Sequence, residues 1–332
     1  MRGDALKTWF YAAASVMGGA WMAPAFYNAG KALSESAAGK HLNGPLNWLA
    51  GVCGRAGFPD FFKLSLLATA LLLFIPFAHW LRGNRLAEGR NVWSMRLPAG
   101  ARSCSGGQPL LENPRGPWQA AAGFLLVVAL FATIATVLFF SIVLDVKRPG
   151  EDFARLVVQQ VALSLLLAAL HEILFRGVVL GIFVRTMRPS IAIAMSALFY
   201  TLVLFCIPPQ GLNVADPEAS SVGFELLGKI AAQAATPGIM LGAIAPCLAL
   251  GCVLAYARWR TASLWLPIGL HAGLLFVNAI LPRLVTSPAD PGLKWSFASP
   301  SLDHGLVPLA AILAAGFLTA RFIRPDADDR PA

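Results

Sequence analysis

The stretch LLLAALHEILFRGVVLGIF, residues 165–183, is apolar along almost its whole length, but His171, Glu172 and Arg176 interrupt it near the middle. On insertion scales, an Arg or Asp at the centre of a membrane helix costs roughly 2.5 to 3.5 kcal/mol. Ionisable residues inside a membrane usually face the interior of the helix bundle and mark a functional site. This stretch therefore predicts a membrane helix that carries a buried polar site.

The composition is that of an integral membrane protein. Of the 332 residues, 57% are hydrophobic and only 13% are charged, whereas a soluble domain has about 25% charged residues. The formal net charge is +9, but the Lys and Arg residues lie mostly in short connections, where they set membrane orientation. We therefore expect the lipid bilayer as a partner and no nucleic acid.

The apolar runs predict an all-α fold, a polytopic membrane helix bundle of about eight transmembrane helices. Each run has roughly the 20 residues that a bilayer core of about 30 Å requires. The predicted spans are 9–29, 61–81, 119–144, 156–184, 189–208, 233–257, 263–282 and 306–323.

The polar segment 82–117 divides the chain and decides its orientation. It holds six Arg and no Lys, and positive residues favour the cytoplasmic side. We expect three parts: residues 1–117 with two helices and this basic cytoplasmic loop, residues 118–325 with the main bundle, and a disordered tail at 326–332. Both termini would then be cytoplasmic, in a multi-pass protein of a bacterial cytoplasmic membrane. The five cysteines form no C-x-x-C pair, and we expect no disulfide.

Two predicted helices carry the buried polar residues. Glu172 and Arg176 are four residues apart, so they share a helix face and can form an ion pair. His271 lies in the middle of the span 263–282. One interpretation is a structural ion pair that holds helices together, and the other is a catalytic or transport site. Tyr200, on a third helix, is interpreted as a packing residue.

Three motifs together resemble the CPBP family of CAAX proteases and bacteriocin-processing proteins. HEILFRG (171–177) is similar to the family's first motif, EExxxR. MRPSIAIAMSALFYTLVLF (187–205) is similar to its second helix, and SLWLPIGLHAG (263–273) to its third motif. The resemblance covers about residues 156–282. It implies an all-helical intramembrane protease core with a water-filled pocket, which hydrolyses a hydrophobic, membrane-associated peptide or protein.

The resemblance assigns a role to each matching position. The family's leading Glu, which activates water, falls on His171, and the next Glu falls on Glu172. The Arg that orders the site falls on Arg176, and the third-motif His, which stabilises the oxyanion, falls on His271. We expect these four residues to form the catalytic site.

Two other family positions are replaced. The second-motif His, which shares the activation of water, falls on Leu204, and the Asn that assists the third-motif His falls on Leu275. Since His171 also replaces a Glu, both members of the water-activating pair differ. A positioned general base typically contributes 10²–10⁴-fold to a rate. Losing both without compensation would leave little hydrolysis.

Three alternatives remain open for this variant site. His171 could act as the base, because an imidazole titrates near neutral pH. His171, Glu172 and His271 could hold a divalent metal such as zinc, leaving a position open for water. Adjacent helix residues point about 100° apart, however, which works against His171 and Glu172 binding one ion, and no cofactor is otherwise expected. Finally, the chain could be an inactive family member that serves as a membrane peptide-binding, immunity or scaffold protein.

Overall fold

A computed structural model describes most of the chain, which is residues 2–37, 44–83, 115–140, 145–146, 150, 152–208, 212, 214–261, 263–286 and 305–322. Most of the predicted basic loop, the predicted tail and Cys104 lie outside them. The other four cysteines, Cys53, Cys206, Cys247 and Cys252, carry free thiols.

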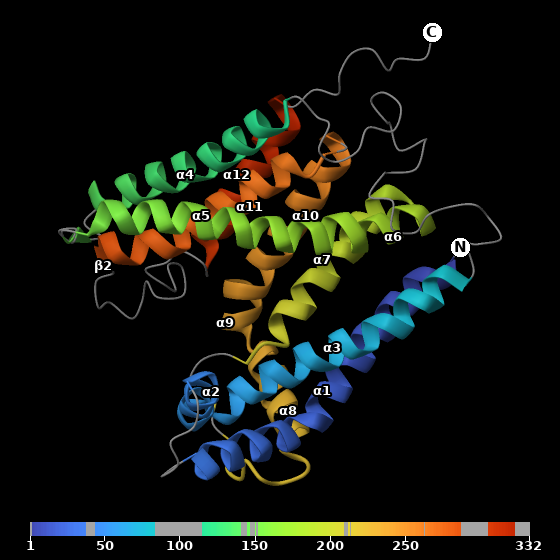
Figure 1. The fold of residues 1–332 in the computed structure, drawn as a ribbon. Coiled ribbons are helices and arrows are strands. Elements are labelled where there is room, and N and C mark those ends of the chain that lie inside the picture. Colours follow the sequence, from blue (N-terminus) through green and yellow to red (C-terminus); the bar gives the residue numbers. More distant parts are fainter. Residues whose placement is uncertain are drawn as a thin grey trace. The chain divides into compact units, whose positions relative to one another are not determined.

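The chain forms two compact units, whose elements are labelled in Figure 1. The first unit groups residues 93–201 and 237–332 with the first two residues, and the second groups residues 3–92 with 202–236. The second unit contains α1 (Arg2–Ala37), α2 (Gly44–Arg55), α3 (Phe58–Gly83) and α8 (Val222–Ala234). α7 (Pro189–Phe205) contributes residues to both units.

The first unit contains the remaining elements. They are α4 (Gly116–Phe140), β1 (Asp145–Val146), α5 (Phe153–Glu172), the π-helix η1 (Ile173–Val179), α6 (Leu180–Thr186), α9 (Pro237–Ile239), the π-helix η2 (Met240–Ile244), α10 (Ala245–Thr261), α11 (Trp265–Leu284), β2 (Val285–Thr286) and α12 (Leu306–Phe322). β1 and β2 form one short antiparallel pair, Asp145 opposite Thr286.

The all-α polytopic fold is confirmed, and the chain is an integral membrane protein, although the spans differ in detail from the prediction. Five helical segments are long and apolar enough to cross a membrane: Phe58–Leu81, Gly116–Val137, Phe153–Thr186, Pro237–Thr261 and Trp265–Leu284. The predicted spans 189–208 and 306–323 form apolar helices of 17 residues each, α7 and α12. The predicted span 9–29 lies inside the 36-residue α1, whose apolar character is diluted by Ala, Gly and Ser.

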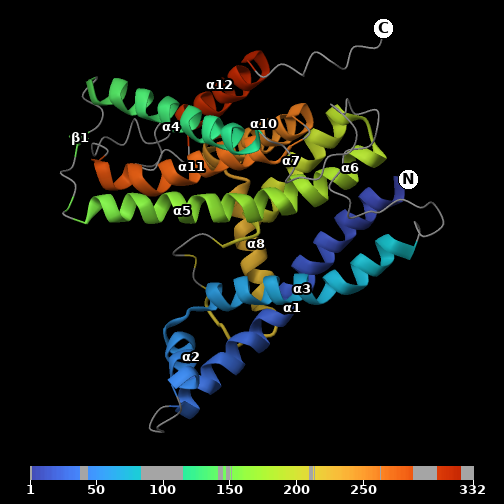
Figure 2. The same ribbon diagram turned by 45° about the horizontal axis from the view of Figure 1, so that its top comes forward.

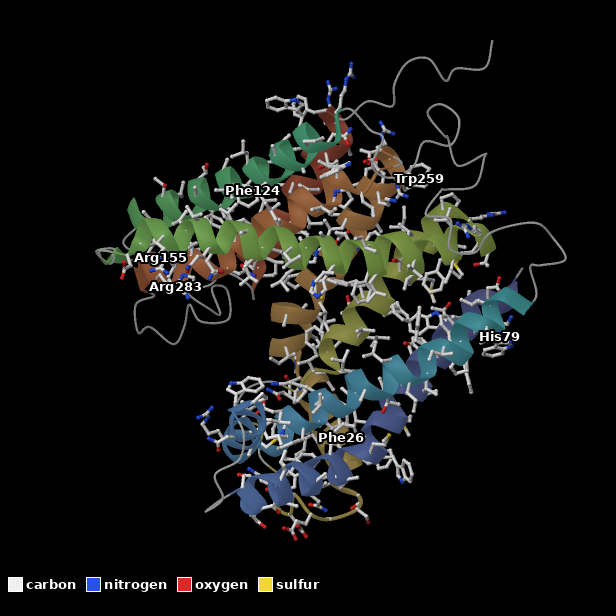
Figure 3. All side chains as sticks on the ribbon, viewed as in Figure 1. Phe26, His79, Phe124, Arg155, Trp259 and Arg283 are labelled. Atoms are coloured by element: carbon white, nitrogen blue, oxygen red, sulfur yellow. The ribbon has the colours of Figure 1, made fainter. Side chains whose placement is uncertain are left out.

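In the first unit, α11 lies between α4 and α5 (Figures 1 and 2). α5 and α11 run antiparallel, and the labelled Arg155 and Arg283 mark their shared end in Figure 3. On the other side, α4 packs its labelled Phe124 ring 5.4 Å from the ring of Phe276 on α11. The core between these helices, α10 and α12 is apolar; its buried residues include Val127, Phe131, Leu254, Leu266, Leu270, Leu274 and Ala311.

Glycines allow α4 and α11 to approach closely. A Cβ added at Gly273 would lie 2.8 Å from the carbonyl oxygen of Phe124, and one at Gly123 would lie 2.9 Å from the amide nitrogen of Leu270. A Cβ at Gly269 would overlap the carbonyl group of Ala120. Small residues four apart are a common basis for helix association in membranes. At about 100° per residue, His271 points away from this glycine face, toward α5.

We expect Gly269→Ala to lower the free energy of unfolding by about 1–3 kcal/mol, the usual cost of overpacking. The added methyl group meets backbone, which cannot rotate away as a side chain would. Gly181→Ala in α6 is the matched control, because a Cβ there meets nothing within 4 Å. This control should be neutral or gain about 0.4–1 kcal/mol. Thermal unfolding of both variants in detergent measures the difference, and equal stability of the two would contradict the glycine contact.

The second unit has its own core, to which α8 contributes one face. Val222, Leu226 and Ile230 of α8 are buried against Phe58 and Phe62 of α3 and against Ala20 and Ala23 of α1. The spacing of four places these α8 residues on one side of the helix. Beside this buried face lies the exposed ion pair between Glu225 and Lys229, with Oε1 and Nζ 2.7 Å apart. None of the predicted spans covers α2 or α8.

Candidate functional site

The candidate site is built where α5 becomes a π-helix. α5 ends at Glu172, and the next turn, η1, is wider and carries Phe175, Arg176 and Gly177, all buried. Single π-turns inside α-helices are rare and occur frequently at functional sites. The turn thus begins directly after the His171–Glu172 pair that the sequence singles out.

Glu172 and Arg176 form the predicted ion pair. Their Oε1 and Nη1 atoms are 2.9 Å apart, and the two side chains are 0% and 1% exposed. Removing two charged groups from water costs free energy unless they are paired and hydrogen-bonded. The close contact therefore lets α5 and η1 keep both groups inside the protein.

His271 of α11 completes a three-residue chain with this pair. Its Nδ1 atom lies 2.7 Å from Oε1 of Glu172, the same oxygen that contacts Arg176. An ionised carboxylate only accepts hydrogen bonds, so Nδ1 of His271 carries the proton and donates a hydrogen bond to Oε1 of Glu172. The tautomer of a neutral His271 then has its lone pair on Nε2, the nitrogen that can act on a reactant.

His171 lies beside His271. The two imidazole rings stack with centroids 5.4 Å apart and planes 24° apart. Nδ1 of His171 is buried and has no hydrogen-bond partner among the described residues. The structure thus places all four of the predicted site residues, His171, Glu172, Arg176 and His271, in one cluster within the first unit; their catalytic role stays a prediction.

Tyr200 of α7 is the neighbour whose position in the site the sequence did not indicate. Its ring lies 4.3 Å from Cζ of Arg176 and 6.2 Å from the His271 ring, and the residue is 3% exposed. A guanidinium over an aromatic face is attracted by the ring's quadrupole. Tyr200 is a packing residue, as interpreted, but the group on which it packs is the guanidinium of Arg176. The sequence holds a signal for this position, because Tyr200 lies one helical turn before Leu204, on which the family's second-motif His falls.

Several buried polar atoms of the cluster have no hydrogen-bond partner among the described residues. They are Nε and Nη2 of Arg176, Oε2 of Glu172 and Nδ1 of His171. Nε and Nη2 form one edge of the guanidinium, whose two parallel N–H groups suit a carbonyl or carboxylate oxygen. Oε2 is an acceptor that suits a donor such as water or a peptide N–H. The cluster therefore contains two donors and an acceptor of the kinds that hydrogen-bond a peptide group or water.

A metal centre is not favoured by this geometry. Within the described residues, no group of three or more His, Cys, Asp and Glu side chains is arranged to hold a metal ion. The His171, Glu172 and His271 set instead includes Arg176 as a direct neighbour, whose guanidinium contacts the oxygen that a cation would need. Positive charge at that position opposes the binding of a second cation.

The two replaced family positions are also described. Leu275 lies on α11 one helical turn beyond His271 and is half-buried. Leu204 lies near the end of α7 and is also half-buried; it groups with the second unit. The cluster of ionisable residues is therefore built by the first unit, from α5, η1 and α11.

Residues 153–277 match the family model described as type II CAAX prenyl endopeptidase Rce1-like. The matched segment begins at α5 and includes His171, Glu172, Arg176, Tyr200 and His271. Neither a curated protein nor a solved structure matches the chain. The match confirms the resemblance of the three motifs, and this segment is similar to the CPBP family of CAAX protease-like intramembrane proteases.

Proposed function

We propose that the chain is an intramembrane endopeptidase that hydrolyses a membrane-associated peptide with a variant catalytic site. The observation that carries the proposal is the 2.7 Å contact between Nδ1 of His271 and Oε1 of Glu172. A carboxylate that holds an imidazole in one tautomer and stabilises its protonated form is the arrangement used by many hydrolases. His271, oriented by Glu172, can therefore serve as a general base although the family's usual water-activating pair is replaced by His171 and Leu204.

In this mechanism, Nε2 of His271 removes a proton from water, and the resulting hydroxide attacks the carbonyl carbon of the peptide bond. Glu172 stabilises the imidazolium that forms. The Nε and Nη2 edge of Arg176 donates hydrogen bonds to the oxygen that becomes negative, the kind of stabilisation that often contributes most to catalysis. The proton on His271 then passes to the leaving nitrogen as the carbon–nitrogen bond breaks, directly or through the stacked imidazole of His171.

The substrate is proposed to be an apolar segment, because the site helix is covered by exposed apolar side chains. Leu170 and Leu174, which flank His171 and Glu172 in sequence, are 57% and 49% exposed. Such side chains on a membrane helix face lipid or another apolar chain. A hydrophobic peptide can therefore reach α5 from the bilayer without exposing its own apolar residues to water.

We expect Glu172→Gln to lower kcat/KM by about 10²–10⁴-fold, because the general base His271 loses the carboxylate that orients it. Glutamine keeps the shape but loses the charge that fixes the His271 tautomer and stabilises the imidazolium. The assay incubates the purified full chain in nanodiscs with a library of hydrophobic peptides and detects new termini by mass spectrometry in ¹⁸O-labelled water. Glu225→Gln, which alters an exposed ion pair on α8, is the control and should leave the rate unchanged.

A second function is favoured by two observations. Both water-activating positions of the family are replaced, and Oε1 of Glu172 already contacts both Arg176 and His271. In this alternative, the chain binds a membrane peptide without cutting it, as an immunity or scaffold protein. Photo-crosslinking with the same peptide library separates the two functions. Crosslinks at α5 without any new termini would support binding alone, whereas ¹⁸O-labelled products that disappear in Glu172→Gln would support hydrolysis.

A further inference from the structure

Helix α2 of the second unit packs little against the rest of the described chain. Of its twelve residues, only Ala50 is buried. Leu46 is 51% exposed, Trp48 69%, Leu49 41% and Val52 36%. An isolated helix of this length is only marginally stable in water, so a further surface is needed to cover these side chains.

The exposed apolar residues of α2 share one side of the helix. At about 100° per residue, Leu46, Trp48, Leu49 and Val52 fall within an arc of roughly 160°. The remaining arc carries polar and small residues, which are Gly44, Asn47, Ala50, Gly51, Gly54 and Arg55. A short helix with one apolar side that includes Trp, and a polar side that includes a basic residue, has the composition of a helix that lies in a membrane interface.

The connections and contacts of α2 fix its position relative to α1 and α3. α2 connects the C-terminal end of α1 to the N-terminal end of α3. Nζ of Lys31, on α1, donates hydrogen bonds to the carbonyl oxygens of Cys53, Gly54 and Ala56, at 3.3, 3.0 and 2.8 Å. A cation at these carbonyls also compensates the helix dipole at the C-terminus of α2. α2 is thereby tied to the last turns of α1.

The neighbouring span provides continuity with lipid. α3 contains the candidate membrane span Phe58–Leu81, and Leu64, Leu67 and Leu71 along it are 49%, 57% and 63% exposed. An apolar surface of this kind is what a bilayer covers. Since α2 directly precedes this span, it lies where the hydrocarbon gives way to headgroups, the depth that Trp side chains prefer.

We propose that α2 is an interfacial helix that binds the surface of the lipid bilayer, with its apolar arc toward the acyl chains and Trp48 at the headgroup level. The inference is independent of the proposed peptidase activity. It assigns to α2 an anchoring role that sets the depth of the α1–α3 pair in the membrane.

Site-directed spin labelling tests this placement in the full chain. Single cysteines replace Leu46, Leu49, Asn47 or Gly51 in a variant whose five native cysteines are changed to serine or alanine, and each protein is labelled in nanodiscs of phosphatidylcholine and phosphatidylglycerol. Collisions with oxygen, which partitions into lipid, are compared with collisions with a water-soluble nickel chelate. Leu71→Cys, within the α3 span, is the matched control for a position facing hydrocarbon.

We expect the labels at 46 and 49 to favour oxygen several-fold over the nickel chelate, and the labels at 47 and 51 to show the reverse. Equal access of nickel to all four positions would overturn the proposal, because α2 would then lie in water. Protection of positions 46 and 49 from both reagents would also overturn it, since a protein surface and not lipid would cover them. Circular dichroism and thermal unfolding of each labelled variant verify that it keeps the fold.

Discussion

Arg176→Met is expected to destabilise the protein by about 3–5 kcal/mol, the usual effect of removing one partner from a buried ion pair. Glu172 is fully buried, so its carboxylate would lose the cation that compensates for its desolvation. Thermal unfolding in detergent measures this loss of stability. The signal is the reaction of a fluorescent maleimide with thiols that become exposed on unfolding, such as those of Cys206, Cys247 and Cys252. Arg155→Met, on the exposed first turn of α5, is the matched control and should change the stability little.

The double variant Glu172→Leu/Arg176→Met separates stability from chemistry. Replacing both partners of a buried pair by apolar residues of similar volume is often neutral or stabilising. We therefore expect the double variant to recover most of the stability that Arg176→Met loses, but to have no peptidase activity. A double variant as unstable as the single one would mean that the pair does more than neutralise itself, for example by ordering the π-turn.

The parts of the site that could be predicted from the sequence are those set by local geometry or by the motifs. The Glu172–Arg176 contact follows from a spacing of four residues on a helix. The meeting of this pair with His271 depends on two helices separated by 99 positions in the chain, which no periodicity can indicate. The three-motif resemblance supplied that information, because it implied one pocket shared by both helices.

Other features could not be read from the sequence because they depend on tertiary contacts. The π-turn that follows Glu172 and carries Arg176 is one such feature, because no residue type signals it. The role of Gly269 and Gly273 is likewise visible only once α4 is placed against them, which leaves His271 on the opposite face of α11. α2 and α8 were missed because each is too short to be distinguished from a connecting segment by hydropathy.

Restoring the family's residues with His171→Glu/Leu204→His is expected to raise kcat/KM by about 10²-fold or more. The resemblance places the water-activating carboxylate and imidazole at these two positions, and a positioned base contributes 10²–10⁴-fold. His171→Glu alone adds a second carboxylate next to Glu172, whose repulsion opposes any gain. The assay with ¹⁸O-labelled water measures turnover of the single and double variants, and thermal unfolding verifies that each remains folded.

The informative quantity is the coupling between the two substitutions. If both side chains act on the same water, the double variant exceeds the product of the single effects, as expected for groups that act as a unit. Leu275→Phe, one turn beyond His271, restores no family residue and serves as the control for a general effect of a substitution near His271. A folded double variant without a gain in turnover would mean that the restored side chains do not activate water toward a peptide bond, and would favour the binding function over hydrolysis.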